Sequence, residues 1–450
     1  MGARVNATRA PRIRRRALLA ATAAAASAHA LGRTPYGGEL TMMVPWALDR
    51  LDPHALDDPV AALFAAAVCD PLYALDALGR PYSALAAGLP EATAEGSRVR
   101  LRPGLASARG RRIDASAVVH SLSRAARLGA LVPRAVPVRR PSRDPLALDF
   151  PGVAPDLLAR ELTSPLAAIV PRDYSPARPD GTGAFVAEFT NGRLTLRRNP
   201  DAARGPAFLE AIVVLPAPDL AESLRAFESG SIDVGWLGAG LHQPRSGAIR
   251  FRGALYGWVI LRTGRGAGRW GAPGIAQQLL DGVPADRLRH LGLEGLVEAP
   301  TASATPGWGG GPATLVVRDD APQLELIARA LSAVLSRPGH EVTVARLPRA
   351  QLELRRKSRD FALMLDFVRS IGSSAVDVQR ALLSAQDPVL ARNPPRRAAN
   401  DVRSVCRALT LGLVGELWAA GAHGPTFRAL EGWQLGNVFE QAPVSATAPA

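Results

Sequence analysis

The stretch that decides the fold is residues 179–234, PDGTGAFVAEFTNGRLTLRRNPDAARGPAFLEAIVVLPAPDLAESLRAFESGSIDV. It opens with the small residues Asp180-Gly181-Thr182-Gly183, which permit positive φ and close backbone approach, so we predict a tight turn. Residues 184–190 and 193–197 then alternate apolar and polar side chains, as half-buried strands do. Asn191-Gly192 lies between them and favours a two-residue turn. The first half therefore predicts a turn and a β-hairpin.

The second half of the stretch changes from strand to helix and back. Residues 209–215 are apolar and β-branched, which predicts a strand. Leu220, Leu224 and Phe227 lie on one helical face, which predicts an amphipathic helix. Asp219 can cap the start of this helix, and Gly230 ends it. Residues 232–234 open another short strand. This order of elements is typical of an α/β protein.

Three motifs in this stretch, at matching spacing, resemble the extracellular solute-binding proteins (family 5) that serve oligopeptide, dipeptide, nickel and haem ABC importers. The motifs are Gly181-Thr182-Gly183-Ala184-Phe185, Arg198-Asn199-Pro200-Asp201 and Gly230-Ser231-Ile232-Asp233. The sequence departs from the family pattern at Ala184 (for proline), Ala202-Ala203 (for an aromatic pair) and Ser231 (for glutamate). The chain thus resembles a divergent and shortened member, and the likeness weakens after Val234.

The resemblance implies a two-lobed, periplasmic-binding-protein-like α/β fold with mixed sheets and a hinge. We expect a signal peptide at 1–30, a first lobe from 31–70, 164–250 and 425–450, an accessory subdomain at 71–163, and a second α/β lobe at 251–424. It also implies a monomer that captures a peptide-like or other small ligand and delivers it to an ABC permease in the inner membrane. The alternative is a degenerate solute-binding fold that acts as a periplasmic scaffold or sensor without transport.

The amino-terminal segment has the pattern of an export signal. Arg14-Arg15-Arg16 precedes an apolar run at 17–28, and Ala28-His29-Ala30 has the small-x-small form of a cleavage site. The run is too short to span a bilayer. Both a twin-arginine signal and a general secretory signal fit this pattern, so both routes stay open. We expect cleavage after Ala30 and a periplasmic location.

Composition indicates a globular protein without a nucleic-acid partner. The chain has 450 residues, 47% of them hydrophobic, which is ample for two or three domains. The net charge of +14 includes six arginines in the segment expected to be removed, and the other charges are mixed in sign along the chain. The basic balance still favours acidic ligands or an anionic surface. Cys69 and Cys406 either pair or remain two buried thiols.

The region 313–366 reads as strand, helix, strand, helix, strand, which predicts a parallel sheet in the second lobe. In such sheets the ligand lies at the carboxyl edge, and here Asp366-Phe367-Val368-Arg369-Ser370 follow the last strand. A further helix is expected at 402–417.

No motif for catalysis or for a cofactor emerges, so we expect neither an enzyme nor a bound cofactor or metal. The glycine-rich segments 264–271 and 301–312 lack the Gly-Lys-Ser/Thr of a phosphate loop and are expected to be loops. His54 follows a proline without a second histidine nearby, so we expect a loop or cap role. An enzyme would need residues that only the fold assembles.

We expect the ligand in a cleft between the lobes, lined by aromatic side chains and two charges. Aromatic rings give large contact area at low entropy cost, and Asp366 with Arg369 suits the charged ends of a peptide. The alternative is that most of the tryptophans belong to the core. The expected lining residues are Trp46, Tyr73, Phe185, Trp236, Trp258, Asp366, Phe367 and Arg369.

Overall fold

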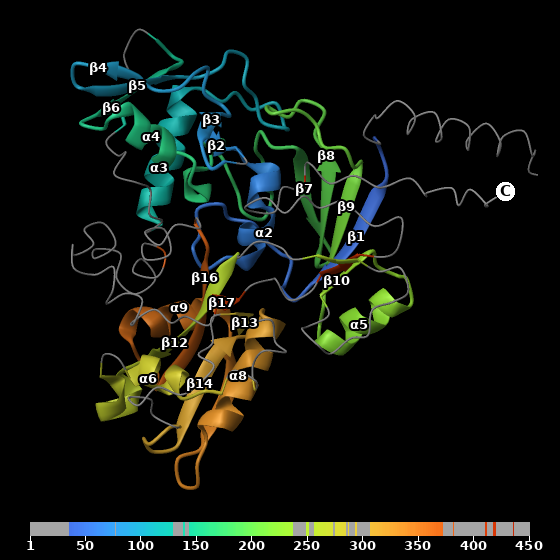
Figure 1. The fold of residues 1–450 in the computed structure, drawn as a ribbon, viewed down its shortest axis with the longest axis vertical. Helices are drawn as coiled ribbons and strands as arrows, with labels where there is room; N and C mark the ends of the chain where they lie inside the picture. Colours follow the sequence, from blue (N-terminus) through green and yellow to red (C-terminus); the bar gives the residue numbers. More distant parts are fainter. Residues whose placement is uncertain are drawn as a thin grey trace, which may run out of the picture.

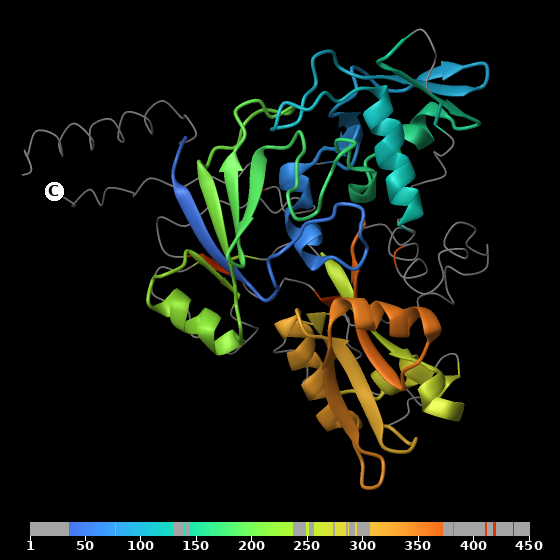
Figure 2. The same ribbon diagram turned by 180° about the vertical axis from the view of Figure 1, so that it is seen from behind.

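The computed structural model describes most of the chain between Tyr36 and Ile371. The described residues are 36–76, 78–128, 138–139, 144–236, 249–251, 256–272, 275–284, 287, 293–294, 307–371, 381, 410–411, 417–419 and 435. They form a two-lobed molecule with an accessory subdomain on the first lobe (Figures 1 and 2). In Figure 1 the accessory subdomain lies at the upper left, the first-lobe sheet at the right and the second lobe below.

The first lobe is built on a mixed seven-stranded sheet. Its central strand β1 (Glu39–Val44) runs parallel to β9 and β10, whereas the β7–β8–β9 and β10–β18–β11 neighbours are antiparallel. In spatial order the strands are β11 (Ile249–Phe251), β18 (Leu417–Ala419), β10 (Val234–Trp236), β1, β9 (Ala211–Pro216), β8 (Arg193–Arg198) and β7 (Phe185–Thr190).

The stretch 179–234 forms the elements expected of it. β7 and β8 pair as a hairpin from Phe185–Arg198 to Thr190–Arg193, and both turn residues, Asn191 (φ 52) and Gly192 (φ 71), are left-handed as the tight turn requires. Asp219 caps α5 (Leu220–Glu228) by accepting a hydrogen bond from the Glu222 N–H at 2.7 Å. The predicted hairpin, strand and helix are therefore confirmed.

The glycine turn before the hairpin packs against α2 (Pro59–Val68). The Gly183 N–H donates to the Val68 carbonyl at 2.9 Å. A Cβ on Gly181 or Gly183 would overlap the backbone at the end of this helix, so both positions exclude larger residues. The turn thus locks α2 to the sheet of the first lobe.

The accessory subdomain has its own core around Leu122, Phe150 and Leu158. Asp114 caps its long helix by accepting hydrogen bonds from the N–H groups of Ser116 and Ala117. Its elements are β2 (Tyr73–Leu75), β3 (Pro81–Ser83), β4 (Glu91–Thr93), β5 (Gly96–Arg100), α3 (Ala115–Arg127), β6 (Ala147–Pro151), α4 (Pro155–Glu161) and η1 (Pro165–Ala167).

The second lobe holds a four-stranded sheet in the order β12-β16-β14-β15, between helices α8 and α9. β14 is parallel to β15 and β16, as the strand–helix alternation predicts. Leu315 and Val317 join the α8 core and Val316 joins Leu352 of α9, so the helices cover opposite faces. The elements are β12 (Gly257–Thr263), η2 (Arg265–Gly271), α6 (Ile275–Asp281), β14 (Ala313–Arg318), α8 (Pro322–Leu335), β15 (Val342–Leu347), α9 (Arg349–Ser358) and β16 (Leu363–Arg369).

One expectation needs correction, and two others lie wholly or partly outside the described residues. Within the helix expected at 402–417, Thr410–Leu411 instead form the strand β17, which pairs antiparallel with β13 (Leu293–Glu294). Two residues are enough for a bridge to form where the partner strand satisfies their backbone groups. Cys69 is a buried free thiol, and Cys406 and the segment 1–35 lie outside the described residues.

Candidate functional site

The two lobes meet along a seam that we define as residues 44–58 of the first lobe against the carboxyl ends of β14 and β16, α9 and Tyr256. Backbone hydrogen bonds cross it: Arg369 N–H donates to Leu56 O at 2.7 Å, and Ala47 N–H donates to Asp320 O at 3.1 Å. The carboxyl edge of the second-lobe sheet therefore faces the loop that follows β1. This is the edge at which open α/β sheets bind ligands.

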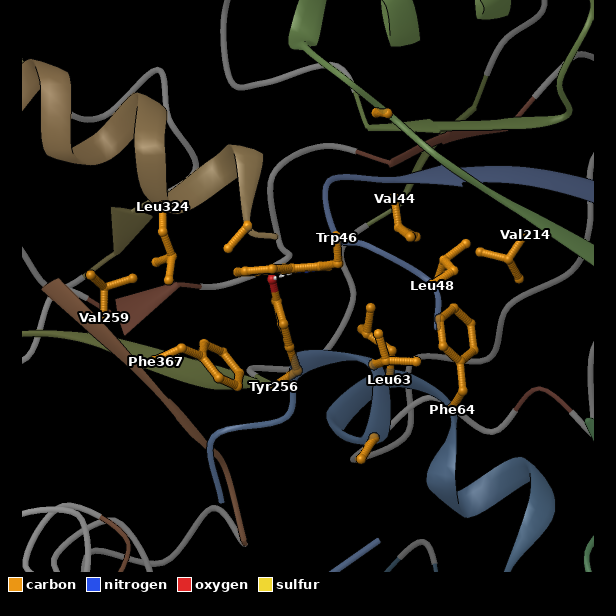
Figure 3. Close-up of a cluster of buried hydrophobic side chains, with 14 of the residues drawn as sticks. Val44, Trp46, Leu48, Leu63, Phe64, Val214, Tyr256, Val259, Leu324 and Phe367 are labelled. Atoms are coloured by element: carbon orange, nitrogen blue, oxygen red, sulfur yellow. Dashed lines mark hydrogen bonds between the residues drawn. The ribbon is translucent and has the colours of Figure 1, made fainter. Parts of the chain in front are cut away.

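The apolar centre of the seam is a trio of aromatic rings, Trp46, Tyr256 and Phe367 (Figure 3). Their ring centroids are 5.5 Å (Trp46–Phe367), 5.6 Å (Tyr256–Phe367) and 6.3 Å (Trp46–Tyr256) apart. The indole Nε1–H of Trp46 donates to the Tyr256 hydroxyl at 3.1 Å, and that hydroxyl lies 3.4 Å from Gln323 Oε1. Each of the three ring contacts adds about 0.5–1.5 kcal/mol beyond area burial.

This trio is fully enclosed: Trp46 is 1% exposed, Tyr256 3% and Phe367 0%. Burial raises the pKa of Tyr256, because the phenolate would lose its solvation. The aromatic trio therefore forms a buried contact that joins the cores of the two lobes.

A cluster of charged side chains joins Asp57 of the first lobe to α9 and to the carboxyl end of β14. Asp57 accepts hydrogen bonds from Arg349 Nη2 at 2.9 Å and Arg356 Nη2 at 3.4 Å, and its carbonyl accepts one from Arg318 Nη1 at 2.6 Å. Burial opposes the charge of Asp57, but the charges of these three arginines outweigh it and lower the pKa of the carboxyl. Arg318 in turn makes a two-pronged ion pair with Asp320.

Asp366 and Arg369, the two predicted anchors, are both engaged with the protein. Asp366 is 1% exposed, and its Oδ2 lies 3.0 Å from Arg356 Nη1 and 3.3 Å from Arg262 Nε. Arg369 is 2% exposed and donates from Nη1 to the Pro53 carbonyl at 2.8 Å. Desolvation lowers the pKa of Arg369 to about 10, against the opposing charges of Asp58 and Asp52.

A third cluster, Asp52, His54 and Arg124, ties the seam to the accessory subdomain. Arg124 makes a two-pronged ion pair with Asp52 at 2.8 and 2.9 Å. His54 Nε2 lies 2.8 Å from Ala168 O and its Nδ1 lies 2.8 Å from Arg124 Nη1, which fits the neutral tautomer that donates from Nε2. Burial, with the charge of Arg124, lowers the pKa of His54 to about 4. His54 thus has a structural role, as its sequence context indicates.

Four of the eight predicted lining residues lie at the seam, and two of them, Trp46 and Phe367, are in ring contact. The expectation that residues 366–370 follow the last strand is wrong, because β16 extends from Leu363 to Arg369 with every residue buried. Successive side chains of a strand point to opposite faces, so Phe367 and Arg369 lie on one face of β16 and Asp366 lies on the other, against Arg356 of α9. Tyr73 lies in the separate core of the accessory subdomain and donates from its hydroxyl to Gly88 O at 3.1 Å. The remaining residues lie in strands of the sheets: Phe185 in β7 (0% exposed), Trp258 in β12 (1% exposed) and Trp236 in β10, where only its backbone is described. Ligand contact by these residues stays a prediction.

Sequence reasoning missed the residues that complete the seam. Tyr256 precedes β12 directly, and Asp57 lies two residues before α2. Arg349 and Arg356 follow a seven-residue spacing on α9, which places them on one helical face. That spacing is a visible signal, but it does not say which carboxylate the face meets.

The described residues hold no cluster of three or more metal-ligating His, Cys, Asp or Glu side chains. In the same part of the chain no helix has the length and apolar character needed to cross a membrane.

No protein-family model and no curated protein matches this sequence. Solved structures do match across nearly the whole chain. NikA from Staphylococcus aureus with Ni(L-His)2 has a TM-score of 0.66 at 14% identity, over 90% of this chain and 100% of that one. The oligopeptide-binding protein AppA from Bacillus subtilis in complex with a nonapeptide has a TM-score of 0.65 at 13% sequence identity, over 91% of this chain and 100% of that one. AgaA from A. tumefaciens R10 in complex with agropinic acid has a TM-score of 0.65 at 14% sequence identity, over 90% of this chain and 99% of that one.

These likenesses establish the fold. The chain has the two-lobed architecture of periplasmic binding proteins, with mixed sheets and helices in the arrangement of the peptide and nickel group. The resemblance inferred from residues 179–234 is therefore confirmed at the level of fold.

Proposed function

We propose that this protein is the exported solute-binding component of an ABC importer, which captures a small, peptide-like ligand between its lobes and presents it to a membrane permease. The observation that carries the proposal is the extent of the fold likeness, about nine-tenths of the chain, to proteins solved with a nonapeptide, a nickel–histidine complex and agropinic acid. Binding needs no catalytic group in this fold, because the work is closure of two lobes around a ligand.

The ligand would lie at the seam, against the carboxyl edge of the second-lobe sheet. The rings of Trp46 and Phe367 offer apolar faces, and Arg369, on the same face of β16 as Phe367, offers a positive charge for the carboxylate end of a peptide. Asp366 offers a negative charge on the α9 face of the same strand, for the amino end. All four side chains are at most 2% exposed here. Ligand contact therefore requires the seam to open, with exchange of the internal partners of Asp366 for groups on the ligand.

A titration of the purified mature protein with short peptides tests this proposal. We expect mixed di- to pentapeptides to raise the melting temperature and to change the small-angle scattering profile as the lobes rearrange. Peptides with acetylated amino and amidated carboxyl ends are the matched control, and should bind at least about tenfold more weakly if charged ends are recognised. Equal binding of blocked and free peptides would show that the charged ends are not recognised, and would leave peptide capture itself standing.

One observation favours a second candidate, a scaffold or sensor that has lost transport. The seven predicted lining residues with described side chains are all buried, and Asp366 is already paired with two arginines. A fold whose cleft residues have become core would have this appearance. Absence of binding to any small peptide, amino acid or metal chelate, together with capture of a single periplasmic partner, would favour the scaffold.

Export from the cytoplasm is part of the proposed function. Replacing Arg15 and Arg16 together with lysine is expected to block export by a twin-arginine route and to leave general secretion nearly intact. Amino-terminal sequencing of the exported protein should begin at Leu31. An exported protein that begins at Met1 contradicts cleavage.

A further inference from the structure

A second feature lies in the second lobe, within the glycine-rich segment that follows β12. Here η2 and the carboxyl end of α9 border a shallow surface hollow of about 290 Å³. Its lining consists of Gly264, Arg265, Gly268, Arg269, Gly271, Ala272 and Arg359. Three of the seven lining residues are arginines, and none of the seven is acidic.

Local backbone geometry builds this hollow. The Arg265 N–H donates to Arg359 O at 2.8 Å and the Gly266 N–H donates to Phe361 O at 3.0 Å, which ties η2 to the start of β16. Gly268 (φ 55) and Arg359 (φ 57) are both left-handed, so the chain turns sharply on both sides of the hollow. A Cβ on Gly271 would overlap Gly264 O, so only glycine lets the loop close on itself.

The arginines that line this hollow form no ion pair with a described residue. Arg265, Arg269 and Arg359 are exposed, and no described carboxylate pairs with any of them. Most other arginines of the same lobe do have carboxylate partners, at 2.6–3.5 Å: Arg262, Arg318, Arg329, Arg346, Arg349 and Arg356. Three arginines that line one hollow raise the positive potential there.

We propose that this hollow binds a phosphate-type oxyanion, through the guanidinium groups of Arg265, Arg269 and Arg359. Guanidinium groups donate parallel hydrogen bonds that match the oxygens of a phosphate, and they stay charged at every physiological pH. The segment lacks the Lys-Ser/Thr of a nucleotide-binding loop, and the volume is at the lower limit for small-molecule sites. A single phosphate group, either free or on an anionic lipid headgroup, fits this site.

Equilibrium titration of the full mature protein with inorganic phosphate, at constant ionic strength set with chloride, tests the proposal. The double variant Arg265→Ser/Arg269→Ser should bind phosphate at least about tenfold more weakly, since it loses two of the three guanidinium donors. Arg193→Ser, an exposed arginine of the first lobe, is the matched control and should bind as the parent does. Because the substituted side chains are exposed, the double variant and the control should have the same melting temperature as the parent.

A second arm identifies the source of the phosphate group. Vesicles of phosphatidylcholine with and without phosphatidic acid are sedimented with the parent and the double variant. If the parent binds the acidic vesicles, the double variant does not, and free phosphate displaces the parent from them, the ligand is a lipid headgroup. If the parent binds inorganic phosphate but not the vesicles, the ligand is the free anion. Either result supports the site. The proposal is overturned if the parent shows no saturable phosphate binding, or if the double variant binds as the parent does.

Discussion

Replacing Asp366 with alanine should destabilise the second lobe and the seam, even in the absence of any ligand. The carboxylate is 1% exposed and lies within 3.3 Å of guanidinium nitrogens from both Arg262 and Arg356. Its removal would leave two positive charges at the seam without their shared partner. The alanine would also remove the acceptor for the backbone N–H of Phe367, at 3.0 Å.

The structure gives a scale for this loss. Removing one partner of a buried ion pair costs about 3–5 kcal/mol, because the remaining charge is left without compensation. Arg356 has a side chain 25% exposed and a second partner in Asp57, so part of its charge can be solvated, whereas Arg262 is only 12% exposed. We therefore expect about 3 kcal/mol, which corresponds to a fall of about 6–12 °C in the melting temperature of a lobe of 150–250 residues.

Differential scanning calorimetry of the ligand-free protein measures this directly. Asp366→Asn should lose less, because its amide oxygen still accepts one hydrogen bond from an arginine. Asp360→Ala, at an exposed acidic position of the same lobe, is the control and should stay within about 0.5 kcal/mol of the parent. If Asp366→Ala melts with the parent, the carboxylate contributes nothing to the folded seam and the reasoning from the ion pairs is wrong.

Two further predictions concern the first lobe. Folding lowers the pKa of His54 from 6.5 to about 4, because the buried imidazole resists protonation. As the pH falls from 6.5 towards 4, the unfolded chain takes up a proton that the folded protein does not, so the free energy of unfolding should decrease by about 3 kcal/mol over this range. His54→Gln keeps both hydrogen-bonding functions without titrating, so its melting temperature should fall less over that range; equal pH profiles would contradict the assignment. Gly181→Ala should lose about 1–3 kcal/mol in chemical denaturation through overlap with Val68 O, whereas Gly88→Ala, with open space around it, should be near neutral.

Features that depend on neighbouring residues could be predicted from the sequence. Asn191-Gly192 needs only its own left-handed conformations to make a hairpin turn, and Asp114 and Asp219 need only the next helical turn to act as caps. The alternation of strands and helices at 313–369 likewise determines a parallel sheet through the handedness of the connections.

Contacts between distant segments could not be predicted in this way. Arg349 and Arg356 reach Asp57 across 292 and 299 residues, and nothing near Asp57 in the sequence marks it as their partner. The apolar run before Asp366 indicated a carboxylate that needs a partner, and Asp366 lies within β16, but ligand and protein arginines satisfy that need equally well. The same limit applies to Trp46 and Phe367, because aromatic residues suit a binding cleft and a core for the same physical reason.

The most direct test of the account is native mass spectrometry of the protein purified, without denaturation, from the compartment to which its own cells export it. A solute-binding protein should carry a small adduct of defined mass, which is released on denaturation and which rebinds to the emptied protein with one-to-one stoichiometry. A mass that equals the mature chain alone, with no rebinding of peptides, amino acids or metal chelates to the refolded protein, would contradict the proposal that this fold still captures a solute.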